Sequence, residues 1–207
     1  YNDVARTVDL PVNPVSRAVR FNKEKRRDAA VLPEDMPLMW ERLQTVENPI
    51  RRMAWLTCIL TGLRVGDVTK MRWEHIDEEG VLTVPSPKGG ADRAFRLPLP
   101  KYLVNELEAF RPVSEMWAGG WVFPAKSKSG HISLLRQTPE FPYFAHQFRH
   151  GVRSYALLAG VDEAVTKLIL NHKDASVTGG YLTKGVVIDA MRKGIEDISE
   201  HLLSYRN

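Results

Sequence analysis

The distribution of apolar and polar positions along the 207-residue chain predicts a mainly α domain with a small β-sheet. Residues 53–60 are apolar almost all round, which is typical of a buried core helix, and Pro49 marks its start. Other helices are expected over residues 32–44, 100–110, 144–158, 162–170 and 186–203. Gly160 follows one of them in the place of a C-cap.

Three short runs between the second and third helices have the composition of β-strands. They cover residues 73–76, 81–84 and 95–99, with turn residues at 77–80 and 87–90 between them. The pattern predicts a small three-stranded antiparallel β-sheet.

The amino-acid composition predicts a soluble globular protein and allows an anionic binding partner. The hydrophobic fraction of 43% and charged fraction of 26% are those of a folded globular protein. No apolar run approaches the roughly 20 residues of a membrane span. The single Cys58 excludes an internal disulfide, so a cytoplasmic location is expected. The net charge of +4 permits a nucleic-acid partner without requiring one.

Residues 1–31 combine prolines with a run of Arg and Lys and are predicted to be a basic linker. The chain begins at Tyr1, and we expect an N-terminal DNA-binding module upstream of it. Arg26 and Arg27 are candidates for phosphate contact, and a plain exposed tether is the alternative.

The most informative stretch lies in the C-terminal third. His146 and Arg149 are three residues apart and share one face of the predicted helix, His172 follows in a polar turn, and Tyr181 follows two glycines. A carboxylate pair, a Ser-His dyad and a glycine-rich nucleotide loop are missing from this set. Tyr181 is the obvious nucleophile.

Two further cations precede this stretch. Arg64 comes directly after the predicted core helix and Gly62, and Asp67 is placed to hold its guanidinium. A surface salt bridge is the alternative reading of that pair. Lys88 lies in the second turn of the predicted sheet, where most lysines serve only solubility.

Together these residues resemble the catalytic domain of the tyrosine recombinases, the family of phage integrases and of the resolvases of chromosome dimers. The similarity covers residues 32–184 in the family's order. Its motifs here are Thr61-Gly62-Leu63-Arg64, Pro87-Lys88-Gly89, His146-Gln147-Phe148-Arg149-His150, Leu170-Asn171-His172 and Thr178-Gly179-Gly180-Tyr181. Asn171 replaces the usual glycine and Gln147 the commoner aspartate. Neither position supplies a catalytic side chain in the family.

The resemblance implies a catalytic domain over residues 32–185 and six catalytic residues: Tyr181, Arg64, Lys88, His146, Arg149 and His172, with Asp67 in support. The arginines would bind the non-bridging phosphate oxygens, and Lys88 would protonate the leaving 5′ oxygen. His172 would assist the oxyanion and His146 the removal of the tyrosine proton.

The same resemblance implies double-stranded DNA attachment sites as partner, a homotetramer on two duplexes, and neither metal nor other cofactor. Lys173 joins Arg26 and Arg27 as a candidate DNA contact. Residues 186–207 would form a C-terminal helix suited to exchange between subunits, and the glycines at 179 and 180 would leave Tyr181 poorly ordered without DNA.

Three alternatives compete with a site-specific recombinase of a phage or mobile element. His146 and His150 have the i, i+4 spacing of a zinc helix, but Gln147 stands where such a helix has its glutamate base. A non-catalytic DNA-binding module would show erosion of one or more of the six residues, and none of them is eroded. A type IB topoisomerase shares the tyrosine chemistry and differs by relaxing supercoils without paired sites.

Overall fold

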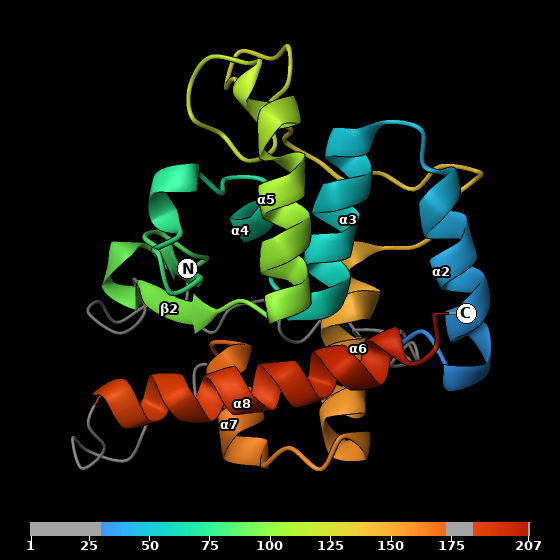
Figure 1. Ribbon diagram of the computed structural model, residues 1–207, viewed down its shortest axis with the longest axis vertical. Helices are drawn as coiled ribbons and strands as arrows, with labels where there is room; N and C mark the ends of the chain where they lie inside the picture. Colours follow the sequence, from blue (N-terminus) through green and yellow to red (C-terminus); the bar gives the residue numbers. More distant parts are fainter. Residues whose placement is uncertain (1–29, 173–183, 207) are drawn as a thin grey trace, which may run out of the picture.

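The computed structural model describes residues 30–172 and 184–206, and helices dominate this part of the chain (Figure 1). The elements are η2 (Pro33–Asp35), α2 (Met36–Thr45), α3 (Pro49–Thr61), α4 (Val65–Val68), η3 (Trp73–His75), β1 (Val81–Val84), η4 (Ala91–Arg93), β2 (Phe95–Pro98), α5 (Lys101–Glu115), α6 (Ala145–Leu158), α7 (Glu163–Ile169) and α8 (Lys184–Leu203). The mainly helical class is confirmed. Residues 1–29 of the predicted linker and the segment 173–183 lie outside the described residues.

Helix α3 is the centre of the core and packs against α2, α5, α6 and α8. Pro49 at its first turn and Asn48, whose side chain accepts the Arg51 N–H at 3.0 Å, fix where it begins. Trp55 is 2% exposed and touches the rings of Phe141 and Phe148, with ring centroids 5.0 and 6.0 Å away. These contacts attach α6, which carries the predicted histidine and arginine, to a rigid base.

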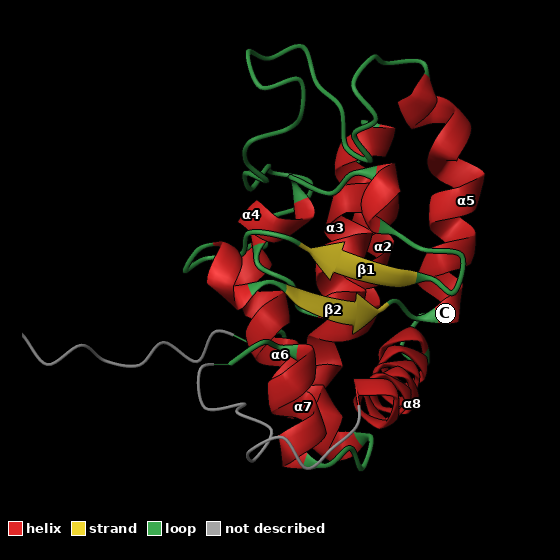
Figure 2. Ribbon diagram, turned by 90° about the vertical axis from the view of Figure 1, so that its left-hand side faces the viewer, coloured by secondary structure: helices red, strands yellow, loops and turns green. Residues whose placement is uncertain are grey.

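The described residues contain a two-stranded sheet, not the predicted three strands. Strands β1 and β2 pair antiparallel, with Val81 opposite Pro98 and Val84 opposite Phe95 (Figure 2). The expected strand over 73–76 is instead the 3₁₀-helix η3.

Tertiary contacts of Trp73 explain this error. Its indole N–H donates to the Ser114 hydroxyl at 2.9 Å, its backbone N–H donates to the Gly120 carbonyl at 3.1 Å, and the Arg111 guanidinium covers its ring at 4.2 Å. These partners lie far along the chain, so local β propensity did not reveal them.

Helix α8 packs on its own domain, across the lower ends of α3 and α5 in Figure 1 and against α6, α7 and β2. Its apolar stripe is buried there, with Met191, Ile195, Ile198 and Leu202 each at most 3% exposed. The Leu202 carbonyl accepts the Trp40 indole N–H at 3.0 Å. Exchange of this helix between subunits stays a prediction. No helix in the described part is long and apolar enough to span a membrane.

The end of α3 depends on Gly62, and this can be tested. Gly62 has φ +62°, and a Cβ there would lie 2.9 Å from Leu170 Cδ2 and 3.1 Å from Val152 Cβ. We expect Gly62→Ala to lower the free energy of unfolding by roughly 2–4 kcal/mol, since backbone strain and overpacking add. Gly66→Ala is the matched control, because Gly66 lies in α4 with open space around it. It should be neutral or stabilise by up to about 1 kcal/mol in urea unfolding. Equal losses in the two variants would contradict this explanation.

Candidate active site

The first arginine is held at a rigid corner between α3 and α4. The Thr61 hydroxyl donates to the Thr57 carbonyl at 2.5 Å and accepts the Leu63 N–H at 3.2 Å. Gly62 ends α3 in the left-handed conformation, and its N–H donates to the Cys58 carbonyl at 3.0 Å. Arg64 follows at once as the N-cap of α4, so its half-buried side chain starts from a fixed backbone.

The second arginine, Arg149, lies on α6 and is only 7% exposed. One of its terminal nitrogens donates to the Gly62 carbonyl at 2.9 Å, and the other donates to the Leu170 carbonyl. The guanidinium therefore joins the Arg64 corner to the residue before Asn171-His172. Gln147 has a local role on the same helix, because its side-chain oxygen accepts the Phe144 N–H at 2.7 Å and caps α6.

The turn after α7 presents His172. Asn171 has φ +45°, a left-handed conformation that asparagine tolerates better than most residues. Its N–H donates to the Leu168 carbonyl at 3.0 Å, and the N–H of His172 donates to the Lys167 carbonyl at 3.1 Å. Asparagine thus fits the position where the family commonly has glycine, and the turn keeps His172 half-buried.

Lys88 comes from the connection between β1 and β2. Its side chain is exposed, and the turn that carries it is closed by a hydrogen bond from the Gly90 N–H to the Pro87 carbonyl at 2.9 Å. Five residues later Arg93, in η4, reaches back toward the loop after α7, since its guanidinium donates to the Asn171 carbonyl at 3.4 Å.

These four segments converge on one open cavity of about 800 Å³. Five of the predicted catalytic residues line it: Arg64, Lys88, His146, Arg149 and His172. Tyr181 and the candidate DNA contacts Lys173, Arg26 and Arg27 lie outside the described residues, as do Gly179 and Gly180. The convergence is a property of the fold, because the five residues span positions 64 to 172 of the chain.

Three further cationic or titratable side chains line the same cavity: Arg93, His150 and Arg153. Arg153 and His150 follow Arg149 and His146 by one helical turn each, so helical spacing places them nearby. Spacing gives no such indication for Arg93. Only the fold of the β1–β2 connection brings it beside Asn171.

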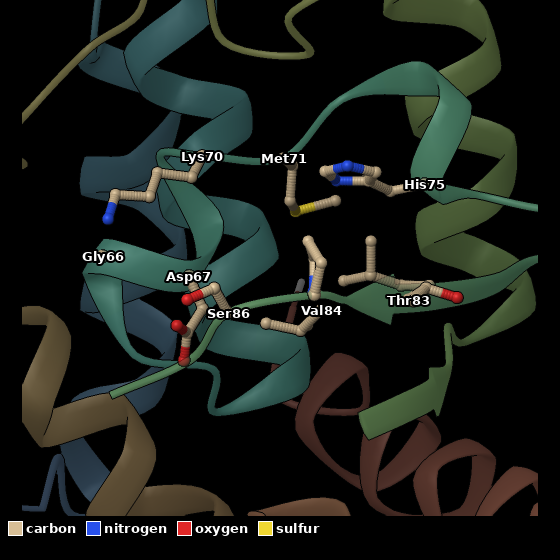
Figure 3. A pocket seen from close by; sticks show the side chains of 10 residues that line it. Gly66, Asp67, Lys70, Met71, His75, Thr83, Val84 and Ser86 are labelled. Carbon is tan, nitrogen blue, oxygen red and sulfur yellow. The ribbon is translucent and has the colours of Figure 1, made fainter. Parts of the chain in front are cut away.

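Asp67 lies behind this cavity and not in it. It lines a separate cavity of about 100 Å³ between α4 and β1, shown in Figure 3 with Ser86 and Lys70. Its Oδ2 atom is buried without a hydrogen-bond partner, and among the described residues no ion pair joins it to Arg64. Asp67 thus lies near the arginines without the direct pairing expected from the sequence.

Burial and mutual repulsion shape the charges of the site. Burial raises the pKa of Asp67, while the nearby Arg64 and Arg149 oppose that rise. Burial, reinforced by the positive charge of Arg64, lowers the pKa of Arg149 to about 10, and Asp67 opposes the fall. Arg149 remains fully charged at neutral pH and so keeps both hydrogen bonds charge-assisted.

His146 is forced toward its neutral form. Partial desolvation lowers its pKa first, and the positive charges of His150, Arg149, Arg64 and Lys88 lower it further. The rings of His146 and His150 meet edge to face, with centroids 4.5 Å apart. A neutral imidazole at neutral pH can accept a proton, which a charged one cannot. Among the described residues no group of three or more His, Cys, Asp or Glu side chains is arranged to hold a metal ion.

Comparison with known proteins decides the family. The sequence pattern of the phage integrase family matches residues 31–185 of the chain. The chain belongs to this family. The predicted family and the predicted class of function, a site-specific tyrosine recombinase, are thereby confirmed.

Individual relatives of the chain are also tyrosine recombinases and integrases. The chain is 26% identical over 220 residues to tyrosine recombinase XerA of Thermococcus kodakarensis, which covers 92% of this chain and 74% of that protein. It is 25% identical over 188 residues to prophage integrase IntF of Escherichia coli K12, covering 86% of this chain and 40% of that one. It is 29% identical over 138 residues to XerA of Pyrococcus furiosus, covering 58% of this chain and 46% of the relative. The match thus spans less than half of two of these three relatives.

Solved structures support the integrase fold. An integrase from mycobacterium phage Brujita superposes with a TM-score of 0.58 at 23% identity, covering 94% of this chain and 69% of the other. The XerH site-specific recombinase in a pre-cleavage complex with its difH substrate superposes with a TM-score of 0.52 at 17% identity, over 70% of this chain and 47% of the other.

The crowding of positive charge around His146 leads to a measurable expectation. In an NMR titration, His146 should have a pKa below its ordinary value, and His150→Gln should raise it because one neighbouring positive charge is lost. A lowered histidine pKa also means that stability declines as the pH falls through the ordinary histidine range, since the unfolded chain binds the proton first. His75→Gln, in the smaller cavity, should leave the titration of His146 unchanged. A His146 pKa at or above the ordinary value would refute the proposed environment.

Proposed function

We propose that this chain cleaves and rejoins DNA at specific sites through a covalent bond between Tyr181 and a 3′ phosphate. The observation that carries the proposal is the cavity in which Arg64, Lys88 and Arg149 surround space beside three histidines. A cavity with this charge suits a phosphodiester in its pentacoordinate transition state, which carries extra negative charge on the non-bridging oxygens.

The two arginines take the roles of phosphate ligands. A guanidinium binds two phosphate oxygens in one plane, and Arg149 is already held by two backbone carbonyls, so one edge of it is fixed before DNA arrives. Arg64 starts from the rigid α3–α4 corner and supplies the second positive charge. His172 adds a hydrogen bond to the developing oxyanion. Asp67 supports both arginines electrostatically from behind the cavity.

Proton transfer falls to the remaining two residues. His146, held neutral by its surroundings, accepts the proton of the Tyr181 hydroxyl as the oxygen attacks phosphorus. Lys88 gives its proton to the 5′ oxygen as the phosphorus–oxygen bond breaks. The 3′-phosphotyrosyl bond keeps the energy of the broken linkage, so a second 5′-hydroxyl can attack it and reseal the strand without ATP.

A DNA partner is supported by the XerH recombinase, whose structure holds that protein bound to its difH substrate. We extend this to paired attachment sites held by four copies of the chain in the cytoplasm. Arg26, Arg27 and Lys173 would contact phosphates beside the cleavage point, and α8 would exchange between neighbouring subunits. A type IB topoisomerase activity is the second candidate, and it requires no paired site.

A covalent capture experiment tests the assignment directly. The chain is incubated with a random library of nicked duplexes from which the short cleaved end diffuses away, and SDS-resistant complexes are isolated and sequenced. We expect adducts enriched in one sequence, and none with Tyr181→Phe, because that variant lacks only the attacking oxygen. Tyr155→Phe is the control, since the Tyr155 hydroxyl is buried and bonds the Val31 carbonyl at 2.9 Å. Adducts formed by Tyr181→Phe would refute the nucleophile, and adducts without sequence preference would favour the topoisomerase.

Removal of one cation of the cavity should slow the chemistry more than it weakens binding. At saturating captured DNA, Arg64→Ala should form the adduct about 10²-fold more slowly, the scale of losing one preorganised charge stabiliser. Arg96→Ala removes the same charge from an exposed pair with Asp77 outside the cavity, and it should keep the parent rate. A defect of Arg64→Ala that appears in affinity alone would reassign this residue to binding.

A further inference from the structure

The side chain of Arg93 covers the turn that carries Lys88. A Cβ added at Gly89 would lie 2.7 Å from Arg93 Cδ, so the arginine stem packs directly on the residue after the lysine. The backbone links the same residues, because the Gly90 carbonyl accepts the Arg93 N–H at 3.1 Å. Arg93 is therefore in direct contact with the turn that carries Lys88.

Arg93 also bonds the loop that presents His172. Its guanidinium donates to the Asn171 carbonyl at 3.4 Å, and the Asn171 side-chain amide donates to the Arg93 carbonyl at 3.5 Å. Each bond is long and weak by itself, but the pair is reciprocal and joins residues 78 positions apart. Glycine at position 171 would lack the amide that makes the second bond.

We propose that Arg93 and Asn171 form a clasp that holds the Lys88 turn against the His172 loop, which makes Arg93 a positioning residue for Lys88. The inference rests on the proposed function, in which Lys88 is the general acid. A lysine on an exposed turn loses much side-chain freedom when it must reach one oxygen atom, and a fixed turn reduces that cost. Proton transfer also requires hydrogen-bond distance to the leaving oxygen.

Strand cleavage forms one bond to phosphorus and breaks another. The bond from the Tyr181 oxygen to phosphorus forms while the hydroxyl proton passes to His146. The bond from phosphorus to the 5′ oxygen breaks, and Lys88 supplies the proton that this oxygen takes up. A substrate with sulfur in place of the 5′ oxygen leaves as a thiolate and needs no proton. Sulfur substitution therefore isolates the part of the rate that depends on correct placement of Lys88.

The competing role of Arg93 is direct phosphate binding, since it lines the cavity itself. A phosphate ligand acts equally on oxygen and sulfur leaving groups, whereas a residue that acts through Lys88 matters only for oxygen. The two roles thus predict different leaving-group dependence.

The test measures adduct formation in single turnover with matched oxygen and sulfur substrates of the captured sequence. Arg93→Ala should slow the oxygen substrate about tenfold, because the bond to the Asn171 carbonyl and the packing of the stem on Gly89 are lost together, and leave the sulfur substrate near the parent rate. Arg93→Gln keeps a stem over Gly89 and should lose less. Asn171→Gly preserves the left-handed turn and removes only the amide, so its oxygen rate should fall a few-fold. The double variant Arg93→Ala/Asn171→Gly should be slower than either single variant on the oxygen substrate, because the guanidinium and the amide make separate bonds, and sulfur should rescue it as well.

Two controls fix the interpretation. Lys88→Ala should show the same rescue by sulfur. Arg153→Ala removes a cavity cation whose ion pair is with Glu163, and it should affect both substrates equally. Equal slowing of both substrates by Arg93→Ala, or an unchanged oxygen rate in Asn171→Gly, would overturn the clasp. Absence of any adduct with the parent chain would instead refute the proposed function.

Discussion

The geometry of this site depends on one buried cation, the guanidinium of Arg149. A charge that is 7% exposed is costly unless its hydrogen bonds are satisfied, and here two backbone carbonyls accept them. Those carbonyls belong to Gly62 and Leu170. Gly62 lies two residues before Arg64, and Leu170 lies two residues before His172. The same bonds that satisfy the buried charge therefore set the distance between two cavity walls. A lysine at this position could not reach both acceptors with a planar fork.

The site carries a positive charge that is poorly balanced within the protein. Arg64, Arg149 and Lys88 surround His146 and push its pKa down, and the nearby carboxylate of Asp67 is itself disfavoured by burial. Mutual repulsion among fixed cations lowers stability, but it also prepares the cavity for an anion, because no reorganisation is needed when a phosphate enters. The packing of α3 against α6 offsets the free energy of folding that is lost to this repulsion.

Two departures from the family pattern gain a physical meaning in the structure. Neither Gln147 nor Asn171 was expected to matter, since neither position is catalytic in the family. Gln147 caps α6 through the Phe144 N–H, and Asn171 accepts a left-handed backbone while its amide reaches Arg93. Both act on the backbone that carries catalytic candidates, so motif identity alone could not show their roles.

The sequence by itself determined six of the helices, the two strands of the hairpin and the residues with suitable chemistry, because helical periodicity, proline and glycine positions and residue type are local properties. It did not indicate the short helix α4. It also indicated the family through five short motifs in order. The tertiary structure decided which of these residues meet. It turned residues 73–75 into a 3₁₀-helix through the partners of Trp73, placed Asp67 behind the cavity, and brought Arg93 against Asn171. Each of these outcomes depends on contacts between segments far apart in the chain, and no local pattern encodes such contacts.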